Sequence, residues 1–258
     1  MVRGVWPGIE EEDRIIIWGG GLWPWLDPLT AIRAMAKVRQ HRSDVRLIFP
    51  GTRHPNPGMA DLSTHNEAAL QTAQDLGLLN KMVFFGDWVP YTNWPSVLLE
   101  SDLALTMHYD TLETRLAFRS RVLDYIWAGL PIVATQGDAT SDLVARYALG
   151  AVVDYQDVDG VCEAIIDLLK TPRESFAERF TRARQALTWK QAARPLIAFC
   201  RRPRHAPDKT DMNEPLGNPY YSHKIKHLQE LVDGYERGHF IRLTRWLNHW
   251  RKKIGRGK

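Results

Sequence analysis

The sequence predicts an α/β protein: a Rossmann-like, doubly wound parallel sheet of about six strands with helices on both faces, plus a C-terminal helical tail. Short apolar runs rich in β-branched and aromatic residues alternate with segments whose apolar residues repeat at helical spacing. Glycine or proline follows several of these segments, as chain turns require. The 258 residues are 44% hydrophobic, which suffices for one well-buried domain and an appendage.

The elements follow one another in a regular order. We expect strands at residues 14–18, 45–49, 83–85, 103–107, 132–135 and 151–153. The first strand, RIIIW, is apolar throughout after its arginine, which is typical of a strand buried on both faces. We expect helices at residues 29–40, 62–76, 94–100, 121–128, 142–148, 158–169, 174–187 and 191–200. Gly77 and Gly129 directly follow two of these helices and indicate C-terminal caps.

Charge divides the chain into a body and a tail. Residues 201–258 contain 14 Lys and Arg against 6 Asp and Glu, whereas residues 1–200 contain 20 against 24; the net charge of the whole chain is +4. Four prolines among polar residues indicate a linker over 201–220. We therefore expect a Rossmann-like domain over residues 1–200, that linker, and a basic amphipathic helical tail over 221–258.

The tail contains an apolar stripe at helical spacing, with basic residues mostly off it. Its members are Phe240, Leu243, Leu247, Trp250 and Ile254. A basic amphipathic helix with tryptophan can lie on an anionic membrane, so residues 239–254 are a candidate membrane contact; docking on protein is the alternative. Nucleic acid is not an expected partner, because base-stacking and groove-reading motifs are lacking. No run approaches the roughly 20 apolar residues of a membrane span, and residues 1–13 lack the apolar run of a signal peptide.

The two cysteines, Cys162 and Cys200, lie in predicted helices among apolar residues. They do not form a Cys-x-x-Cys pattern, which argues against both a zinc site and a disulfide framework. We interpret them as buried free thiols in a reducing cytoplasm.

Two loops at strand ends are candidate binding segments, because ligands of open α/β sheets bind outside the carboxyl ends of the strands. Gly19, Gly20 and Gly21 follow the first strand and allow backbone N–H groups to approach an anion closely; a structural tight turn is the alternative. Trp88 and Val89 follow the third strand, where an aromatic ring and exposed backbone could bind a base. Core packing is the alternative role for Trp88.

A third candidate is the start of the helix expected over 121–128. Arg119 and Arg121 flank Ser120 there, although the helix dipole disfavours positive charge at this end. Two arginines at a helix N-terminus therefore indicate an anion such as a diphosphate. Asp124, one turn later, could accept hydrogen bonds from a ribose diol. The alternative is that the arginines pair with a neighbouring carboxylate, from Asp110, Glu113 or Asp124.

The run RSRVLDYIWAGLPIVA, residues 119–134, resembles the signature helix and strand of the family 4, or group 1, retaining glycosyltransferases. WGGGLWPWLDPLTAIRAMAKV at 18–38 and FFGDWVPY at 84–91 are similar to a bacterial subgroup tied to cell-surface polysaccharide synthesis. The resemblance covers about residues 3–205. It implies two Rossmann-like domains facing each other across a cleft, with residues 1–200 as the nucleotide-sugar-binding domain. The acceptor-binding domain is expected to be missing from this chain.

The resemblance also assigns roles by position. Asp124 falls on the family's second signature glutamate, which holds the ribose hydroxyls. The first signature glutamate is replaced by Leu116, and Glu113 is the nearest acid that could substitute for it. The family's phosphate-neutralising arginine and lysine have no counterparts, so Arg119 and Arg121 are expected to supply that charge. We predict as nucleotide-sugar-binding residues Gly19, Gly20, Gly21, Trp88, Val89, Ser120 and Asp124, and as catalytic residues Glu113, Arg119 and Arg121.

The activity that the resemblance implies is transfer of a hexosyl group, with retention of configuration, from a nucleoside-diphosphate sugar to a cell-surface glycan or lipid-linked acceptor. No metal or cofactor is expected, and the isolated chain is expected to be inactive. The expected location is cytoplasmic and peripheral at the inner membrane face. Two alternatives stay open: a degenerate or truncated nucleotide-binding module without activity of its own, and half of a nucleotide-sugar epimerase.

Overall fold

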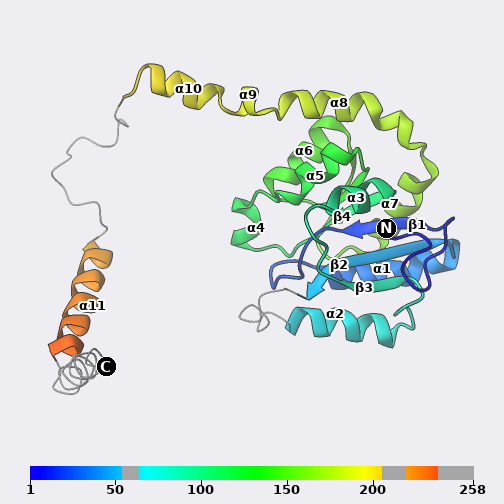
Figure 1. The fold of residues 1–258 in the computed structure, drawn as a ribbon, viewed down its shortest axis with the longest axis horizontal. Coiled ribbons are helices and arrows are strands. Elements are labelled where there is room, and N and C mark those ends of the chain that lie inside the picture. Colours follow the sequence, from blue (N-terminus) through cyan, green and yellow to red (C-terminus); the bar gives the residue numbers. More distant parts are fainter. Residues whose placement is uncertain (54–63, 205–218, 238–258) are drawn as a thin grey trace, which may run out of the picture. The chain divides into compact units, whose positions relative to one another are not determined.

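The computed structural model describes residues 1–53, 64–204 and 219–237 (Figure 1). Its six strands are Arg14–Trp18 (β1), Val45–Arg53 (β2), Val83–Asp87 (β3), Leu103–Thr106 (β4), Ile132–Thr135 (β5) and Gly150–Val153 (β6). Every neighbouring pair is parallel, and the order is β3-β2-β1-β4-β5-β6. The predicted doubly wound parallel sheet is therefore confirmed. The chain forms two compact units, Met1–Pro195 and Leu196–Lys258, and the sheet belongs to the first.

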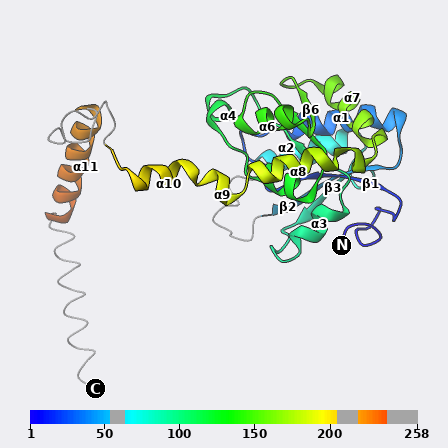
Figure 2. The same ribbon diagram turned by 90° about the horizontal axis from the view of Figure 1, so that it is seen from above.

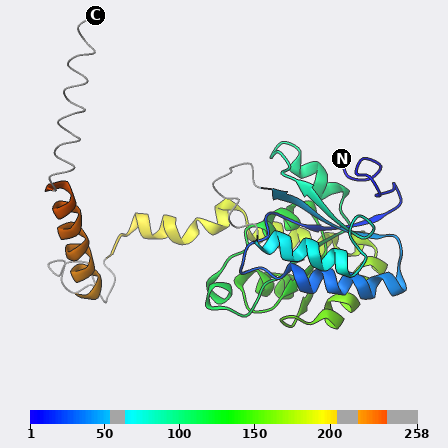
Figure 3. The same ribbon diagram turned by 90° about the horizontal axis from the view of Figure 1, so that it is seen from below.

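Helices cover both faces of the sheet. One core joins the sheet to Pro28–His41 (α1), Thr64–Asp75 (α2) and Val158–Lys170 (α7). The other core lies between the sheet and Trp94–Glu100 (α3), Arg121–Ala128 (α5), Ala139–Tyr147 (α6) and Ala177–Ala186 (α8). Accordingly, α8 lies in front of the sheet in Figure 2, whereas α1 and α2 lie in front of it in Figure 3.

Strand β1 shows why the sheet is buried on both sides. Successive side chains of a strand point to opposite faces. Ile16 and Trp18 accordingly pack in the core of α1, α2 and α7, whereas Ile15 and Ile17 pack in the opposite core. All four are fully buried, as the continuous apolar run predicts.

The helix boundaries follow from capping residues. Helix α1 begins after Asp27, whose carboxylate accepts a hydrogen bond from the backbone N–H of Thr30 at 3.0 Å, and Pro28 opens the helix. Helix α5 has the predicted bounds and ends at Gly129, whose φ of 69° is left-handed. Helix α6 begins earlier than the predicted residue 142, because Asp138 and Ser141 form a reciprocal capping box.

Three further predictions need correction. A short helix, Leu112–Leu116 (α4), occupies a segment predicted as loop. The predicted helix 174–187 is a 3₁₀ turn, Arg173–Phe176 (η2), followed by α8. The predicted helix 191–200 is divided into Trp189–Ala192 (α9) and Arg194–Arg201 (α10), because Pro195 has no N–H to continue the hydrogen-bond ladder.

The second unit contains most of α10 and the helix Pro219–Arg237 (α11). Cys162 is buried on α7, as predicted, but Cys200 on α10 is exposed, so the interpretation of both thiols as buried was wrong for Cys200. The predicted apolar stripe of 240–254 lies outside the described residues, as does most of the predicted linker. No helix within the described ranges is long and apolar enough to cross a bilayer.

Candidate functional site

The strand order places the candidate site between β1 and β4. The strands that follow β1 lie on one side of this pair and the strands that follow β4 lie on the other. The connections after β1 and after β4 therefore leave toward opposite faces of the sheet. A crevice at the carboxyl ends of such a pair is the usual ligand site of an open parallel sheet. Trp18, the last residue of β1, is in register with Leu105 of β4. The glycines that follow Trp18 and the start of α5 are therefore the segments to compare.

Tyr125 ties the glycine loop, Gly19–Gly21, to the sheet. Its hydroxyl oxygen accepts a hydrogen bond from the Gly19 N–H at 2.7 Å and donates one to the Leu105 carbonyl at 3.3 Å. A Cβ at position 19 would lie only 2.6 Å from that oxygen, so this approach requires glycine. Gly20 has a φ of +91°, which also favours glycine. Burial raises the pKa of Tyr125 to about 12, so the hydroxyl keeps its proton at neutral pH.

Arg121 extends from the first turn of α5 toward the same loop. Its Nη2 lies 3.7 Å from the position a Cβ would take on Gly20, and its Cζ lies 6.0 Å from the Trp18 ring centroid. Arg121 and Tyr125 are four residues apart, so they share one face of the helix. On that face, Tyr125 binds the backbone of the glycine loop, and Arg121 places its guanidinium beside the loop.

The Arg121 side chain is half-buried and has no matching anion. Its Nη1 is a buried nitrogen with no hydrogen-bond partner, and within the described ranges no carboxylate forms an ion pair with it. Burial lowers the pKa of this guanidinium, and the positive charge of Arg119 lowers it further, while Tyr125 opposes the shift. A cation that is partly removed from water and has no counter-ion is costly unless an anion binds it. Arg121 therefore has the surroundings expected of an anion ligand.

Arg119 has a different environment. Its Nη1 and Nη2 donate to the two carboxylate oxygens of Glu113 at 2.8 and 2.7 Å, and its Nε lies 3.5 Å from Asp138 Oδ2. Nη2 also donates to Thr114 Oγ1 at 3.3 Å. For Arg119 the structure thus shows the carboxylate pairing that sequence reasoning gave as the alternative. The bidentate pair holds Glu113 in place, with its side chain 46% exposed.

Sequence reasoning missed the buried carboxylate of Asp138. Asp138 caps α6, accepting from the backbone N–H groups of Thr140 and Ser141. His108 follows β4, and its Nε2 lies 3.3 Å from Asp138 Oδ2. Burial opposes ionisation of Asp138, but the contact with His108 and the hydrogen bonds at the cap outweigh it and lower the pKa of the carboxyl. The Asp-x-x-Ser spacing was the signal that could have identified this cap.

Asp124 is linked to the glycine loop through a tryptophan. The exposed Asp124 carboxylate accepts a hydrogen bond from Trp94 Nε1 at 3.2 Å. The Trp94 ring lies 3.3 Å from where a Cβ would stand on Gly19. Ser120, the N-cap residue of α5, is exposed and makes no side-chain cap bond. The structure thus gathers the glycine loop, Arg121 and Asp124 around Trp94 and Tyr125, two residues that the sequence analysis did not select.

Trp88 and Val89 lie farther along the sheet. They follow β3, which is two strands from β1. Trp88 is 46% exposed, and its ring lies 3.5 Å from the Cβ position of Gly51 on β2. Val89 is partly buried against the core that contains α3 and α5. These two residues border the same edge of the sheet as the glycine loop, on the side of β2.

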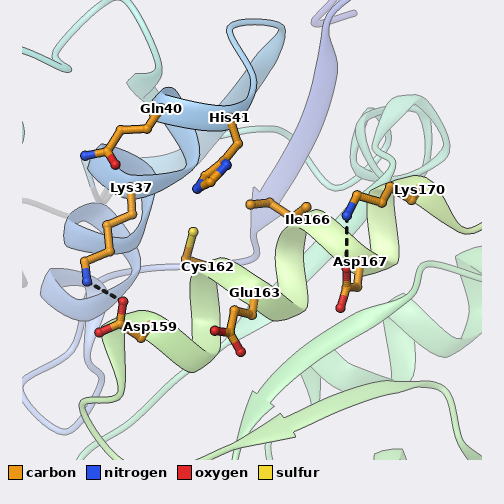
Figure 4. Close-up of a pocket in the computed structure, with 9 residues that line it drawn as sticks. All are labelled: Lys37, Gln40, His41, Asp159, Cys162, Glu163, Ile166, Asp167 and Lys170. Carbon is orange, nitrogen blue, oxygen red and sulfur yellow. Dashed lines mark hydrogen bonds and ion pairs between the residues drawn. The ribbon is translucent and has the colours of Figure 1, made fainter.

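A surface pocket of about 590 Å³ lies elsewhere, between α1 and α7 (Figure 4). Its charged groups are already paired in part: Lys37 contacts Asp159, and Lys170 lies 3.3 Å from Asp167. The pocket lies between two helices rather than at strand ends, and neither the glycine loop nor the start of α5 lines it. Within the described part of the chain, no cluster of three or more His, Cys, Asp or Glu could hold a metal ion.

Comparison with known proteins identifies the family. The family model described as "Glycosyl transferases group 1" matches residues 13–171, more than half of the chain. The chain belongs to this family. No curated protein matches the sequence. The predicted resemblance to group 1 glycosyltransferases is confirmed.

Solved glycosyltransferases share the fold of this group 1 chain. WaaG, a glycosyltransferase involved in lipopolysaccharide biosynthesis, is 21% identical with a TM-score of 0.53; the match covers 74% of this chain and 47% of WaaG. The C-terminal domain of the group 1 protein LpcC from Francisella tularensis is 15% identical with a TM-score of 0.55, covering 68% of this chain and 85% of that domain.

A trehalose 6-phosphate synthase from Burkholderia multivorans is 12% identical with a TM-score of 0.59, covering 74% of this chain and 42% of the synthase. The chain thus spans less than half of WaaG and of the synthase, and most of the isolated C-terminal domain of LpcC. At these identities the likeness shows the fold alone.

Proposed function

We propose that this chain binds a nucleoside-diphosphate sugar, with the diphosphate between the glycine loop and Arg121. One observation carries the proposal: a half-buried guanidinium with an unpaired, buried Nη1 adjoins a glycine of positive φ at the carboxyl end of a central strand. Membership of the group 1 glycosyltransferases supports a sugar donor as the source of the anion. The backbone of Gly20 and Gly21 would supply N–H groups, and Arg121 would supply the charge.

The remaining donor contacts follow from their positions. We assign the ribose hydroxyls to Asp124, which Trp94 orients, and the base to the backbone and ring at Trp88 and Val89. Ser120 lies beside the phosphates at the start of α5. Arg119 supports the site indirectly, because its charge is paired with Glu113 and lies near Asp138.

We propose that the chemistry is hexosyl transfer with retention of configuration and without a metal ion. The bond from the anomeric carbon to the phosphate oxygen breaks, the acceptor hydroxyl bonds to the same face of that carbon, and its proton leaves with the diphosphate. Negative charge grows on the leaving phosphate, and Arg121 would stabilise it electrostatically. Loss of one such preorganised donor costs about 10²–10³ in rate in other enzymes.

The acceptor side is also a proposal. The acceptor would be a cell-surface glycan or a lipid-linked sugar bound by a second domain outside residues 1–258. The isolated chain is then expected to bind the donor without turnover. We place it in the cytoplasm, peripheral at the inner membrane face, with residues 239–254 as a candidate membrane contact.

A thermal-shift panel of UDP, GDP, ADP and their sugars tests donor binding. A ligand at 100 times its Kd stabilises the folded state by about 2.7 kcal/mol. Arg121→Ala should abolish the shift, whereas Arg115→Ala, which removes an exposed arginine paired with Asp110, should keep it. A panel in which no nucleotide shifts the melting temperature contradicts the proposal.

A binding module without turnover is the second candidate, and one observation favours it. Leu116, at the position of the family's first signature glutamate, is 80% exposed, and Glu113 is held by Arg119. Donor binding by this chain, with no transfer even when an acceptor domain is supplied, would establish that candidate.

A further inference from the structure

Helix α10 carries an exposed apolar face. Leu196, Ile197 and Phe199 are 64%, 45% and 50% exposed, and Cys200 is exposed beside them. At 3.6 residues per turn these four side chains fall within an arc of about 160°. Arg201 falls outside the arc. The helix is therefore amphipathic, and its apolar side faces solvent.

The sequence on both sides of this face carries charge of a single sign. Residues 179–207 contain eight Lys and Arg and no Asp or Glu. Arg201, Arg202 and Arg204 follow the apolar face directly, and all three are exposed. Within the described ranges none of the three forms an ion pair. An exposed apolar face beside several basic residues is complementary to a surface that is apolar inside and anionic outside.

Helix α11 provides a comparison within the same chain. It also has an exposed apolar stripe, formed by Ile225, Leu228, Leu231 and Val232. Its polar residues carry both signs, however, including Glu230 and Asp233 next to the stripe. Mixed charge of this kind suits a protein partner or solvent. The absence of acidic residues from 179 to 207 is what favours lipid over protein for α10.

We propose that residues 194–204 form a membrane-contact segment that binds an anionic lipid bilayer. Leu196, Ile197 and Phe199 would enter the boundary between headgroups and acyl chains, and Arg201, Arg202 and Arg204 would bind the lipid phosphates. This segment is distinct from the candidate membrane contact expected at residues 239–254. The proposal does not rest on the donor site.

Vesicle co-sedimentation of the full chain tests the charge requirement. We expect binding to phosphatidylcholine vesicles that contain phosphatidylglycerol, and little binding to phosphatidylcholine alone. Arg201→Gln/Arg202→Gln/Arg204→Gln should weaken binding about 100-fold, since each basic residue near an anionic surface contributes about fivefold. A control with the same change in net charge, in exposed side chains of the first unit, should bind like the wild type: Arg33→Gln/Lys81→Gln/Arg146→Gln.

The exposed Cys200 gives a reading local to α10. An environment-sensitive dye on Cys200, in a Cys162→Ala background, should shift to the blue on anionic vesicles and be quenched by lipids with brominated acyl chains. Leu196→Ser/Phe199→Ser should reduce both signals. Because both side chains are exposed, the variant should unfold at the same temperature as the wild type, which checks that the fold is kept.

Two results would overturn the proposal. The first is sedimentation of the chain with vesicles while the dye at Cys200 stays in water, which would show that residues outside 194–204 bind the membrane. The second is failure of the chain to bind anionic vesicles at low salt.

Discussion

Removing the hydroxyl of Tyr125 tests how the glycine loop is held. In Tyr125→Phe the Gly19 N–H loses its acceptor at 2.7 Å, and the Leu105 carbonyl loses a longer bond of 3.3 Å. The ring stays in its buried position, so no large cavity forms. The main cost is the desolvation of a buried donor left unpaired, about 1–3 kcal/mol. Equilibrium denaturation should show this loss in the free energy of unfolding.

The matched control is Tyr91→Phe, which removes the same atom from a side chain that is 87% exposed. Surface changes of this kind stay within about 0.5 kcal/mol. If Tyr125→Phe is as mild as Tyr91→Phe, then the hydroxyl does not hold Gly19 and the description of the loop is wrong.

A double-mutant cycle sharpens the test. Gly19→Ala should be strongly destabilising, because its Cβ would lie 2.6 Å from the Tyr125 hydroxyl. In the Tyr125→Phe background the hydroxyl contact is gone, so the same substitution should cost less, although ring atom Cε1 of residue 125 and the Trp94 ring still lie 3.2 and 3.3 Å away. We expect a coupling energy of about 0.5–3 kcal/mol. Additive effects would contradict the geometry.

Three further predictions concern charge. Arg119→Ala should lower the free energy of unfolding by about 1–3 kcal/mol, because it breaks charged hydrogen bonds, whereas Arg121→Ala should leave stability unchanged or raise it; urea denaturation of both variants checks this. The pKa of Asp138 is lowered in the folded state, so its contribution to the free energy of unfolding is present above the pKa of the unfolded chain, near 4, and is lost as pH falls. Asp138→Asn should therefore reduce the loss of stability at acid pH, and Asp142→Asn, at an exposed position, should not. The pKa of Tyr125 is raised to about 12, so stability should fall between about pH 10 and pH 12, and Tyr125→Phe should remove that component of the pH profile.

The sheet could be predicted because its signals are local. Apolar runs of four or five residues alternate with helical periodicity, and four elements, β1, α3, α5 and β5, have the predicted bounds. Errors arose where a cap outranked the hydrophobic pattern. Asp138 starts α6 three residues early, Thr111 caps the unpredicted α4, and Pro195 divides a helix whose apolar residues had indicated continuity.

The candidate site was predictable only in outline. The glycines and the arginines were visible as unusual residues at strand and helix ends. Which arginine pairs with a carboxylate depends on where each side chain points in the folded chain. Arg119 points to Glu113, and Arg121 points to Gly20. The role of Tyr125 could not be predicted for a similar reason, because an aromatic residue inside a helix is first interpreted as a core residue. Its hydroxyl is seen to bind the loop only once the fold brings Gly19 next to it.

In the proposed function, Arg121 binds the phosphates of the donor. Isothermal titration calorimetry of the wild type and Arg121→Ala, each with a nucleoside diphosphate and the matching monophosphate, measures this contact. The wild type should bind the diphosphate more tightly, and the variant should bind the two nucleotides alike. If Arg121→Ala retains the full preference for the diphosphate, the anion site lies elsewhere and the proposed function loses its main support.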